Sequence, residues 1–226
     1  MCTLESMGTA QNRKVFARHG AGGNTFGVSF ADLGRLQKQI KTDQALAAAL
    51  WKTGNSDARS LATEIADPAA MRSQEMDAWV RQIDYYCHAD QFARLVSRSP
   101  LAESKMKAWT RSKEEFVGQV GWDLLGILAM SGADLPDSYF EKHLETIEKN
   151  IHRAKNRVRH AMNGALIGIG MRGAKLEKLA LAAAGRIGKV TVDHGATNCK
   201  TPDAAAYIKK AKEYRKRKGR GAVKKV

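Results

Sequence analysis

The chain has 226 residues, and its balance of 43% hydrophobic and 27% charged residues is that of a soluble globular protein rather than a disordered or fibrous one. Its formal net charge is +15 at pH 7, so nucleic acid is the leading class of partner and an anionic membrane surface is the alternative. The longest apolar stretch, residues 164–171, is far short of a membrane span, and residues 1–7 lack the composition of a signal peptide. We therefore expect a soluble, cytoplasmic protein.

Apolar residues recur three and four positions apart along almost the whole chain, whereas alternating, strand-like segments are nearly absent. This periodicity predicts helices at residues 9–19, 30–41, 43–52, 56–66, 73–82, 84–97, 103–110, 113–130, 138–150, 153–170, 174–187 and 203–217. Because the intervening turns are short, neighbouring helices must pack antiparallel, in a helical bundle or an α-solenoid. No period of matching letters is visible, but divergent helical pairs of about 35–45 residues are compatible with HEAT-like repeats.

The breaks between these segments carry helix-start chemistry. A serine precedes a carboxylate by three residues, the spacing of a capping box, at Ser29, Ser112 and Ser138. A cap residue precedes a proline at Ser99-Pro100 and Thr201-Pro202. Residues 20–27 are rich in glycine, but no strand precedes them and no Gly-Lys-Ser/Thr follows. We interpret them as a helix–helix linker rather than a phosphate-binding loop.

Residues 150–171 contain no acidic side chain. An apolar stripe runs along this segment, and the helical wheel places Arg153, Arg157, His160 and Gly164 on one face beside it, with Lys155 and Arg159 on the other side. The alternative is a face that is merely solvated, but the absence of compensating acids favours phosphate binding. The DNA-binding candidates here are Arg153, Lys155, Arg157, Arg159 and His160.

The C-terminal segment is the most basic part of the chain. From Asp203 to Val226 there are ten Lys or Arg residues and two acids, which gives this segment +8 of the +15. An apolar set is predicted to dock on the body of the protein, namely Ala204, Tyr207, Ile208, Ala211 and Tyr214. The cations left outside would form an electrostatic arm for DNA, with a purely solubilising role as the alternative; they are Lys209, Lys210, Lys212, Arg215, Lys216, Arg217 and Lys218. We expect one domain over residues 1–218 and a basic, disordered tail over 219–226.

Tyr86 and Asp90 are four residues apart, so on a helix they share a face. A carboxylate beside an aromatic ring can act on a cationic substrate, because the carboxylate stabilises positive charge and the ring adds a stacking or cation–π contact. The alternative interpretation is a surface aspartate next to a half-buried tyrosine.

The three cysteines, Cys2, Cys87 and Cys199, are widely separated, so neither a disulfide framework nor a dense metal-binding spacing is indicated. His88 beside Cys87, and His194 near Cys199, lack the ligand number and spacing of a zinc site. We expect a reducing compartment, no metal and no cofactor.

Several short segments, taken in order, resemble the DNA alkylation repair proteins of AlkD type. They are Phe26-Gly27-Val28, Leu50-Trp51, residues 57–62, Trp79 ahead of Tyr86 and Asp90, Trp109 with residues 114–116, and residues 157–161. The resemblance runs from about residue 12 to residue 190. It implies an all-α fold, an α-solenoid of HEAT-like repeats, with a concave, positively charged DNA-binding face. Active members of this family are glycosylases that excise N3- and N7-alkylated purines.

The resemblance also assigns roles to residues. Asp90 stands at the position of the family's catalytic aspartate, and Tyr86 stands where active members have a tryptophan. The family's catalytic arginine corresponds to Gln119 and its second active-site tryptophan to Gly164, so one cation and one ring are replaced. The resemblance thus predicts a protein that binds damaged double-stranded DNA and hydrolyses the N-glycosidic bond of alkylated purines. The competing hypotheses are a non-catalytic helical scaffold for nucleic acid and a solenoid that recognises acidic proteins.

Overall fold

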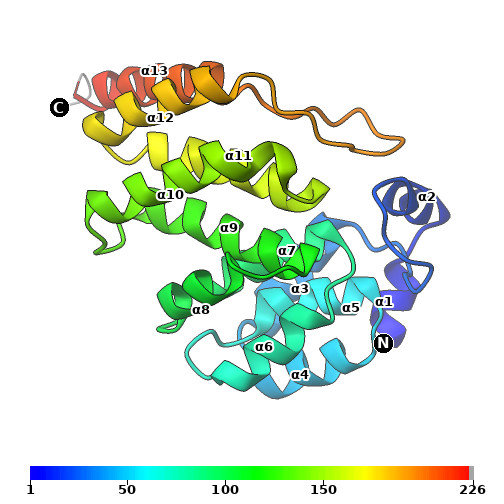
Figure 1. Ribbon diagram of the computed structural model, residues 1–226. Helices are drawn as coiled ribbons and strands as arrows, with labels where there is room; N and C mark the ends of the chain where they lie inside the picture. The colour runs from blue at the N-terminus through cyan, green and yellow to red at the C-terminus, as the bar shows by residue number, and fades with distance from the viewer. Residues whose placement is uncertain (224–226) are drawn as a thin grey trace. The chain divides into compact units, whose positions relative to one another are not determined.

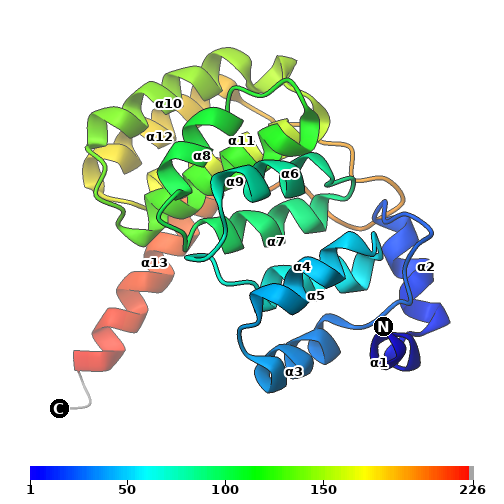
Figure 2. The same cartoon turned by 90° about the horizontal axis from the view of Figure 1, so that it is seen from below.

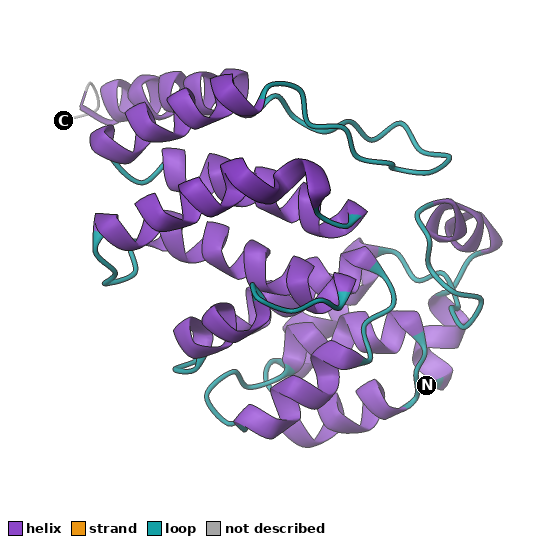
Figure 3. Ribbon diagram, in the orientation of Figure 1, coloured by secondary structure: helices purple, strands orange, loops and turns teal. Residues whose placement is uncertain are grey.

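The computed structural model describes residues 1–223, apart from the side chains of Lys216 and residues 218–223. All regular structure in this part of the chain is helical (Figure 1), and no strand occurs among the described residues (Figure 3). The chain divides into two compact units. The first unit comprises Met1–Gly121 with Asp193–Cys199, and the second comprises Trp122–Val192 with the described part of Lys200–Val226. The single domain over residues 1–218 stays a prediction.

The first unit is built from helical pairs in two layers. Its helices are α1 (Cys2–Met7), α2 (Ala10–Arg18), α3 (Phe30–Ile40), α4 (Gln44–Lys52), α5 (Ser56–Ile65), α6 (Ser73–Arg81), α7 (Tyr86–Val96), α8 (Ala102–Trp109) and the first part of α9 (Glu115–Ser131). In one layer α3, α5 and α7 lie side by side, while α4 packs against α5 and α6 against α7 (Figure 2). Every helix predicted in this region is confirmed to within a turn. The six-residue α1 was not predicted.

The helical pairs of the first unit recur at an even spacing. The outer helices α4, α6 and α8 begin at Gln44, Ser73 and Ala102. The inner helices α5, α7 and α9 begin at Ser56, Tyr86 and Glu115. The repeat in this unit is therefore shorter than the predicted 35–45 residues.

Aromatic side chains form the core of the first unit. The rings of Trp51 and Trp79 stack with centroids 4.3 Å apart and an interplanar angle of 5°. Phe92 lies 6.0 Å and 6.1 Å from these rings and 5.9 Å from Trp109. All four side chains are buried. Such offset and tilted ring pairs stabilise a core beyond the area that they bury, so the tryptophans that carry the family resemblance here serve packing.

The predicted linker at residues 20–27 is confirmed, and Asp57 holds its end in place. Asp57 is 3% exposed, and its carboxylate accepts four hydrogen bonds, from Thr25 Oγ1 and from the backbone N–H groups of residues 26–28, at 2.6–3.1 Å. Gly27 has φ = 80°, and a Cβ at this position would lie 2.5 Å from the carbonyl oxygen of Thr9. Glycine is needed here because other residues resist this backbone conformation. The four hydrogen bonds to Asp57, called the Asp57 clamp below, fix the start of α3.

The second unit contains the rest of α9, α10 (Asp137–Asn150), the 3₁₀ turn η1 (Ile151–Arg153), α11 (Asn156–Gly170), α12 (Ala174–Ile187) and α13 (Ala204–Val223). Helix α12 packs against α10, α11 and α13, and α11 also packs against α13. Helices α9 and α11 cross closely, because a Cβ on Gly168 would lie 2.6 Å from the carbonyl oxygen of Gly126. Helix α11 begins at Asn156, three residues after the predicted start, because η1 and two extended residues precede it.

Helix α13 extends to Val223, beyond the predicted end at residue 217. The expected tail 219–226 therefore falls partly on this helix, and residues 224–226 lie outside the described residues.

Of the predicted caps, Ser29 is confirmed, because its side chain accepts a hydrogen bond from Asp32 N. Thr201 was wrong, since the Oδ1 atom of Asp203 caps α13 instead. Ser138 was also wrong, because α10 begins one residue earlier without a side-chain cap. No helix in the described chain is long and apolar enough to cross a membrane.

Candidate functional site

Three of the predicted site residues lie together in the first unit. Tyr86 and Asp90 are half-buried on α7, and Gln119 on α9 is 1% exposed. Gln119 Nε2 donates to Asp90 Oδ1 at 2.8 Å and to the carbonyl oxygen of Tyr86 at 3.2 Å. Because a buried amide held at two points has few rotamers left, Gln119 fixes the direction in which the Asp90 carboxylate points.

The Tyr86 hydroxyl lies 2.6 Å from Nδ1 of His19, which ends α2. This contact joins residues far apart in the sequence, so no local pattern could have pointed to His19. The neighbouring ring of Tyr85 packs edge-on against Tyr86 with centroids 5.3 Å apart. Burial, reinforced by a hydrogen bond with Cys87, raises the pKa of Tyr85, so this phenol stays protonated. Tyr86 is therefore held by His19 and by the ring of Tyr85, one helical turn from Asp90.

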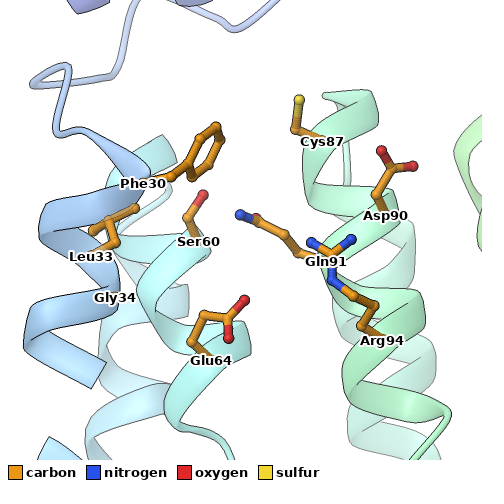
Figure 4. Close-up of a pocket in the computed structure, with 9 residues that line it drawn as sticks. All are labelled: Phe30, Leu33, Gly34, Ser60, Glu64, Cys87, Asp90, Gln91 and Arg94. Carbon is orange, nitrogen blue, oxygen red and sulfur yellow. The ribbon is translucent and has the colours of Figure 1, made fainter. Parts of the chain in front are cut away.

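A pocket of about 430 Å³ adjoins Asp90 (Figure 4). It lies on the layer of α3, α5 and α7 and is lined by Phe30, Leu33, Gly34, Ser60, Glu64, Cys87, Asp90, Gln91 and Arg94. Apart from Asp90, none of these side chains was predicted as a site residue. Gln91 is adjacent to Asp90 in the sequence, but its burial depends on how α5 and α7 pack, which no local pattern reports.

His88 has a structural role behind this site. It is 2% exposed, and Nε2 lies 3.0 Å from the carbonyl oxygen of Ser56, so the proton must be on Nε2. The other ring nitrogen, Nδ1, is buried and has no hydrogen-bond partner in the described chain. Burial lowers the pKa of His88, which keeps the ring neutral. Among the described residues, no group of three or more His, Cys, Asp or Glu side chains is arranged to hold a metal ion.

The basic segment of the second unit differs from the helical-wheel prediction. Ala154 and Lys155 have extended backbone conformations, with ψ of 152° and 156°, and they separate η1 from α11. Arg153 therefore does not share a helical face with Arg157, and that placement was wrong. Arg153 and Lys155 are exposed, whereas Arg157 and His160 are half-buried. Gly164 is exposed on α11, with open space where a Cβ would stand.

Arg159 binds the protein's own backbone. Its Nη1 donates to the carbonyl oxygen of Thr191 at 2.8 Å, and its Nη2 donates to those of His152 at 3.3 Å and Ala154 at 3.0 Å. One guanidinium thus ties together η1, the extended residues that follow it, and the first part of the loop after α12. Arg159 fixes the segment that presents Arg153 and Lys155.

Helix α13 docks as predicted through Ala204 and Ile208, which are buried, but Tyr207 and Tyr214 are 52% and 59% exposed, so their predicted docking was wrong. Two of the predicted outer cations contact the protein: Lys212 forms an ion pair with Glu177, and Arg215 Nη1 donates to Met171 O at 3.0 Å. The remaining described cations, Lys209, Lys210 and Arg217, are exposed. The side chains of Lys216 and Lys218 lie outside the described residues.

Comparison with known proteins agrees with this fold. Residues 1–208 match the family described as DNA alkylation repair enzyme. Two relatives, the uncharacterized proteins Lin0241 of Listeria innocua serovar 6a and Lmo0209 of Listeria monocytogenes serovar 1/2a, are each 27% identical over 215 residues, which is 92% of this chain and 94% of the relative.

A solved structure is similar over 95% of this chain and 92% of its own, with a TM-score of 0.84 and 29% identity. It is described as a new family of proteins related to the HEAT-like repeat DNA glycosylases with affinity for branched DNA structures. The predicted all-α fold of HEAT-like repeats is thereby confirmed. With a family match that spans nearly the whole sequence, this chain belongs to the DNA alkylation repair enzyme family.

Proposed function

We propose that this protein binds DNA, with higher affinity for branched than for linear duplexes, through phosphate contacts made by the second unit. The observation that carries this proposal is the segment held by Arg159. Its guanidinium binds three carbonyl oxygens and so fixes η1 and the extended residues after it, where Arg153 and Lys155 are exposed. No acidic residue occurs between residues 150 and 171, so nothing within this segment neutralises the two cations.

The positive charge of the second unit also favours DNA as the partner. Cations held on a fixed backbone gain affinity for DNA when phosphates release their condensed counterions. The exposed cations of α13, Lys209, Lys210 and Arg217, add to the field of the same unit. The preference for branched DNA rests on the similar solved protein, whose family has affinity for branched DNA structures.

Fluorescence anisotropy on a three-way junction and on a linear duplex of the same sequence, between about 50 and 200 mM salt, tests this proposal. We expect tighter binding to the junction. The double variant Arg153→Glu/Lys155→Glu should weaken binding to both DNAs and reduce the slope of log K against log salt concentration by about two.

The control is Lys142→Glu/Lys178→Glu, which makes the same change in net charge at exposed positions of α10 and α12. If both double variants weaken binding equally, net charge alone attracts DNA and the assigned surface is wrong. Equal affinity of the wild type for junction and duplex would overturn the preference for branched DNA.

A second candidate function, excision of N3- or N7-alkylated purines, is favoured by the contact of Gln119 with Asp90. In this reaction the C1′–N bond of the nucleotide breaks, and its electron pair neutralises the alkylated, cationic base. A water oxygen then bonds to C1′ and loses one proton to the solvent. A fixed carboxylate lowers the barrier because it stabilises the positive charge that develops on the sugar.

Release of methylated bases from alkylated duplex DNA, measured beside the Asp90→Asn variant, tests this candidate. Release by the wild type and not by Asp90→Asn, with duplex affinity unchanged, would assign excision to Asp90. Equal release by both proteins would refute that assignment. No release by the wild type, with DNA binding intact, would mean that the protein is a non-catalytic DNA-binding member of its family.

A further inference from the structure

The pocket beside Asp90 contains a polar group that the protein itself leaves unsatisfied. Gln91 is 6% exposed, its side chain makes no hydrogen bond with the described part of the chain, and its Oε1 atom is fully buried. Its side chain extends from α7 toward Ser60 on α5, across the floor of the pocket (Figure 4). Buried amides are nearly always hydrogen-bonded, since an unpaired one costs about 1–3 kcal/mol. The Nε2 group of this amide is therefore suited to a ligand that offers an acceptor.

An aromatic ring stands at the mouth of the same pocket. Phe30, the first residue of α3, is 52% exposed, and it lines the pocket above Leu33, which is buried. Its position is fixed because the Asp57 clamp holds the backbone just before α3. An exposed, positioned phenyl ring offers a flat apolar surface on which a planar group can stack.

The charges of the pocket exclude a phosphate. Two carboxylates, Glu64 and Asp90, line it with one guanidinium, that of Arg94. The excess of negative charge repels a phosphate group and accepts a planar group that is neutral or cationic. The volume of about 430 Å³ falls in the range of pockets that enclose a small ligand.

We infer that this pocket takes up one unpaired purine base from DNA, such as adenine, stacked on Phe30 and hydrogen-bonded by Gln91. The amide of Gln91 matches a purine because its Nε2 group, which faces the pocket, can donate to N7. Asp90 lines the same pocket, so a base held there brings its own sugar to this carboxylate. The inference rests on the proposed DNA binding and adds to it the group that is recognised, since branch points and bulges present unpaired bases without the full energy of extrusion from a duplex.

Four duplexes of otherwise identical sequence test the inference, with a single bulged adenine, a bulged 7-deazaadenine, a bulged abasic analogue, or no bulge. We expect the wild type to bind the adenine bulge about tenfold more tightly than the abasic bulge, from stacking and hydrogen bonding together. The affinity for 7-deazaadenine should lie between these values, because that base has the same shape but lacks the N7 acceptor.

Two variants separate the two contacts. Phe30→Ala should lower the preference for adenine over the abasic site to less than threefold, while Phe30→Trp should keep it. Gln91→Met, which nearly conserves volume, should abolish the difference between adenine and 7-deazaadenine and leave the affinity for the abasic bulge unchanged. Met130→Ala is the control for Phe30→Ala, because Met130 is 51% exposed and does not line the pocket. Circular dichroism of each variant checks that the helices are intact.

A wild type that binds all four duplexes with equal affinity would overturn the inference and leave the proposed DNA binding in place. A wild type that binds none of them would overturn both. Free deoxyadenosine is titrated alone as a further arm. If it binds as tightly as the bulged duplex, the pocket is a site for free nucleosides, and the assignment to DNA is wrong.

Discussion

Gln119 Nε2 donates a 2.8 Å hydrogen bond to Asp90 Oδ1, while the Oε1 atom of the same amide is buried without a partner in the described chain. The resemblance that aligns this position with the family's arginine makes the contact informative. An amide orients the Asp90 carboxylate as an arginine can, but it brings no positive charge to the site. The geometry around Asp90 is thus fixed, whereas its electrostatics differ from those of a site with a cation at this position.

A positive charge at residue 119 should increase the rate of any base excision. We expect Gln119→Arg to raise the single-turnover rate of methylated-base release by about tenfold, because a guanidinium stabilises charge that a neutral amide cannot. Gln119→Leu, which removes the donor, should lower the rate below that of the wild type. Rates of base release from one alkylated duplex give the comparison, with duplex affinity measured in parallel. A Gln119→Arg protein that folds, binds DNA and shows no gain would mean that charge at residue 119 does not limit the reaction.

Removing the Arg159 side chain should weaken both the fold and the binding of DNA. Arg159→Met leaves three carbonyl oxygens without their charged donor, and we expect the free energy of unfolding to fall by about 1–3 kcal/mol. DNA affinity should fall too, because the residues that carry Arg153 and Lys155 lose their support. Urea unfolding and anisotropy measure the two effects. Arg186→Met is the control, since its ion pair with Glu148 is on the surface and should contribute little.

Asp57 should be among the residues most important for stability in the first unit. Asp57→Ala removes the acceptor of four hydrogen bonds in a buried position, and we expect a loss of about 3 kcal/mol or more, measured by thermal unfolding. Asp43→Ala removes a single, exposed cap bond to Leu46 N and should cost about 1 kcal/mol. Similar losses in the two variants would mean that the clamp is not a main support of the linker.

His88 should make the fold sensitive to mild acid. Burial lowers its pKa in the folded state below the ordinary value of 6.5, so the unfolded chain binds this proton more readily than the folded one. The part of the free energy of unfolding that depends on neutral His88 is fully present above pH 6.5. It is lost as the pH drops from 6.5 toward the lowered pKa of the folded state. Urea unfolding at several pH values should show this loss, and His88→Gln, which keeps a donor for Ser56, should show a smaller one. An identical pH dependence in both proteins would exclude His88 as its cause.

The helices could be predicted from the sequence because their signals are local. Apolar spacing and caps such as Ser29 lie within the segment that they define, so α2 to α10 and α12 were located to within a turn. The break at Ala154 and Lys155 was missed, since their extended backbone depends on the bonds that Arg159 makes to distant residues.

The candidate site was predictable in part. Tyr86 and Asp90 share one helical turn, so their proximity follows from spacing, and the contact with Gln119 agrees with the family resemblance. The pocket was not predictable, because Phe30 and Gln91 come from helices whose packing sets their burial. Similarly, composition showed that α13 is basic but not that Lys212 and Arg215 bind the protein's own surface.

The aromatic core of the first unit also allows unfolding to be followed by intrinsic tryptophan fluorescence. Three of the four tryptophans, Trp51, Trp79 and Trp109, are buried in the first unit, and Trp122 is the first residue of the second. Intrinsic fluorescence therefore reports mainly on the first unit, whereas far-ultraviolet circular dichroism reports on the helices of both. If the two signals change at the same urea concentration, the chain unfolds cooperatively as one body; if they separate, the two units melt in turn.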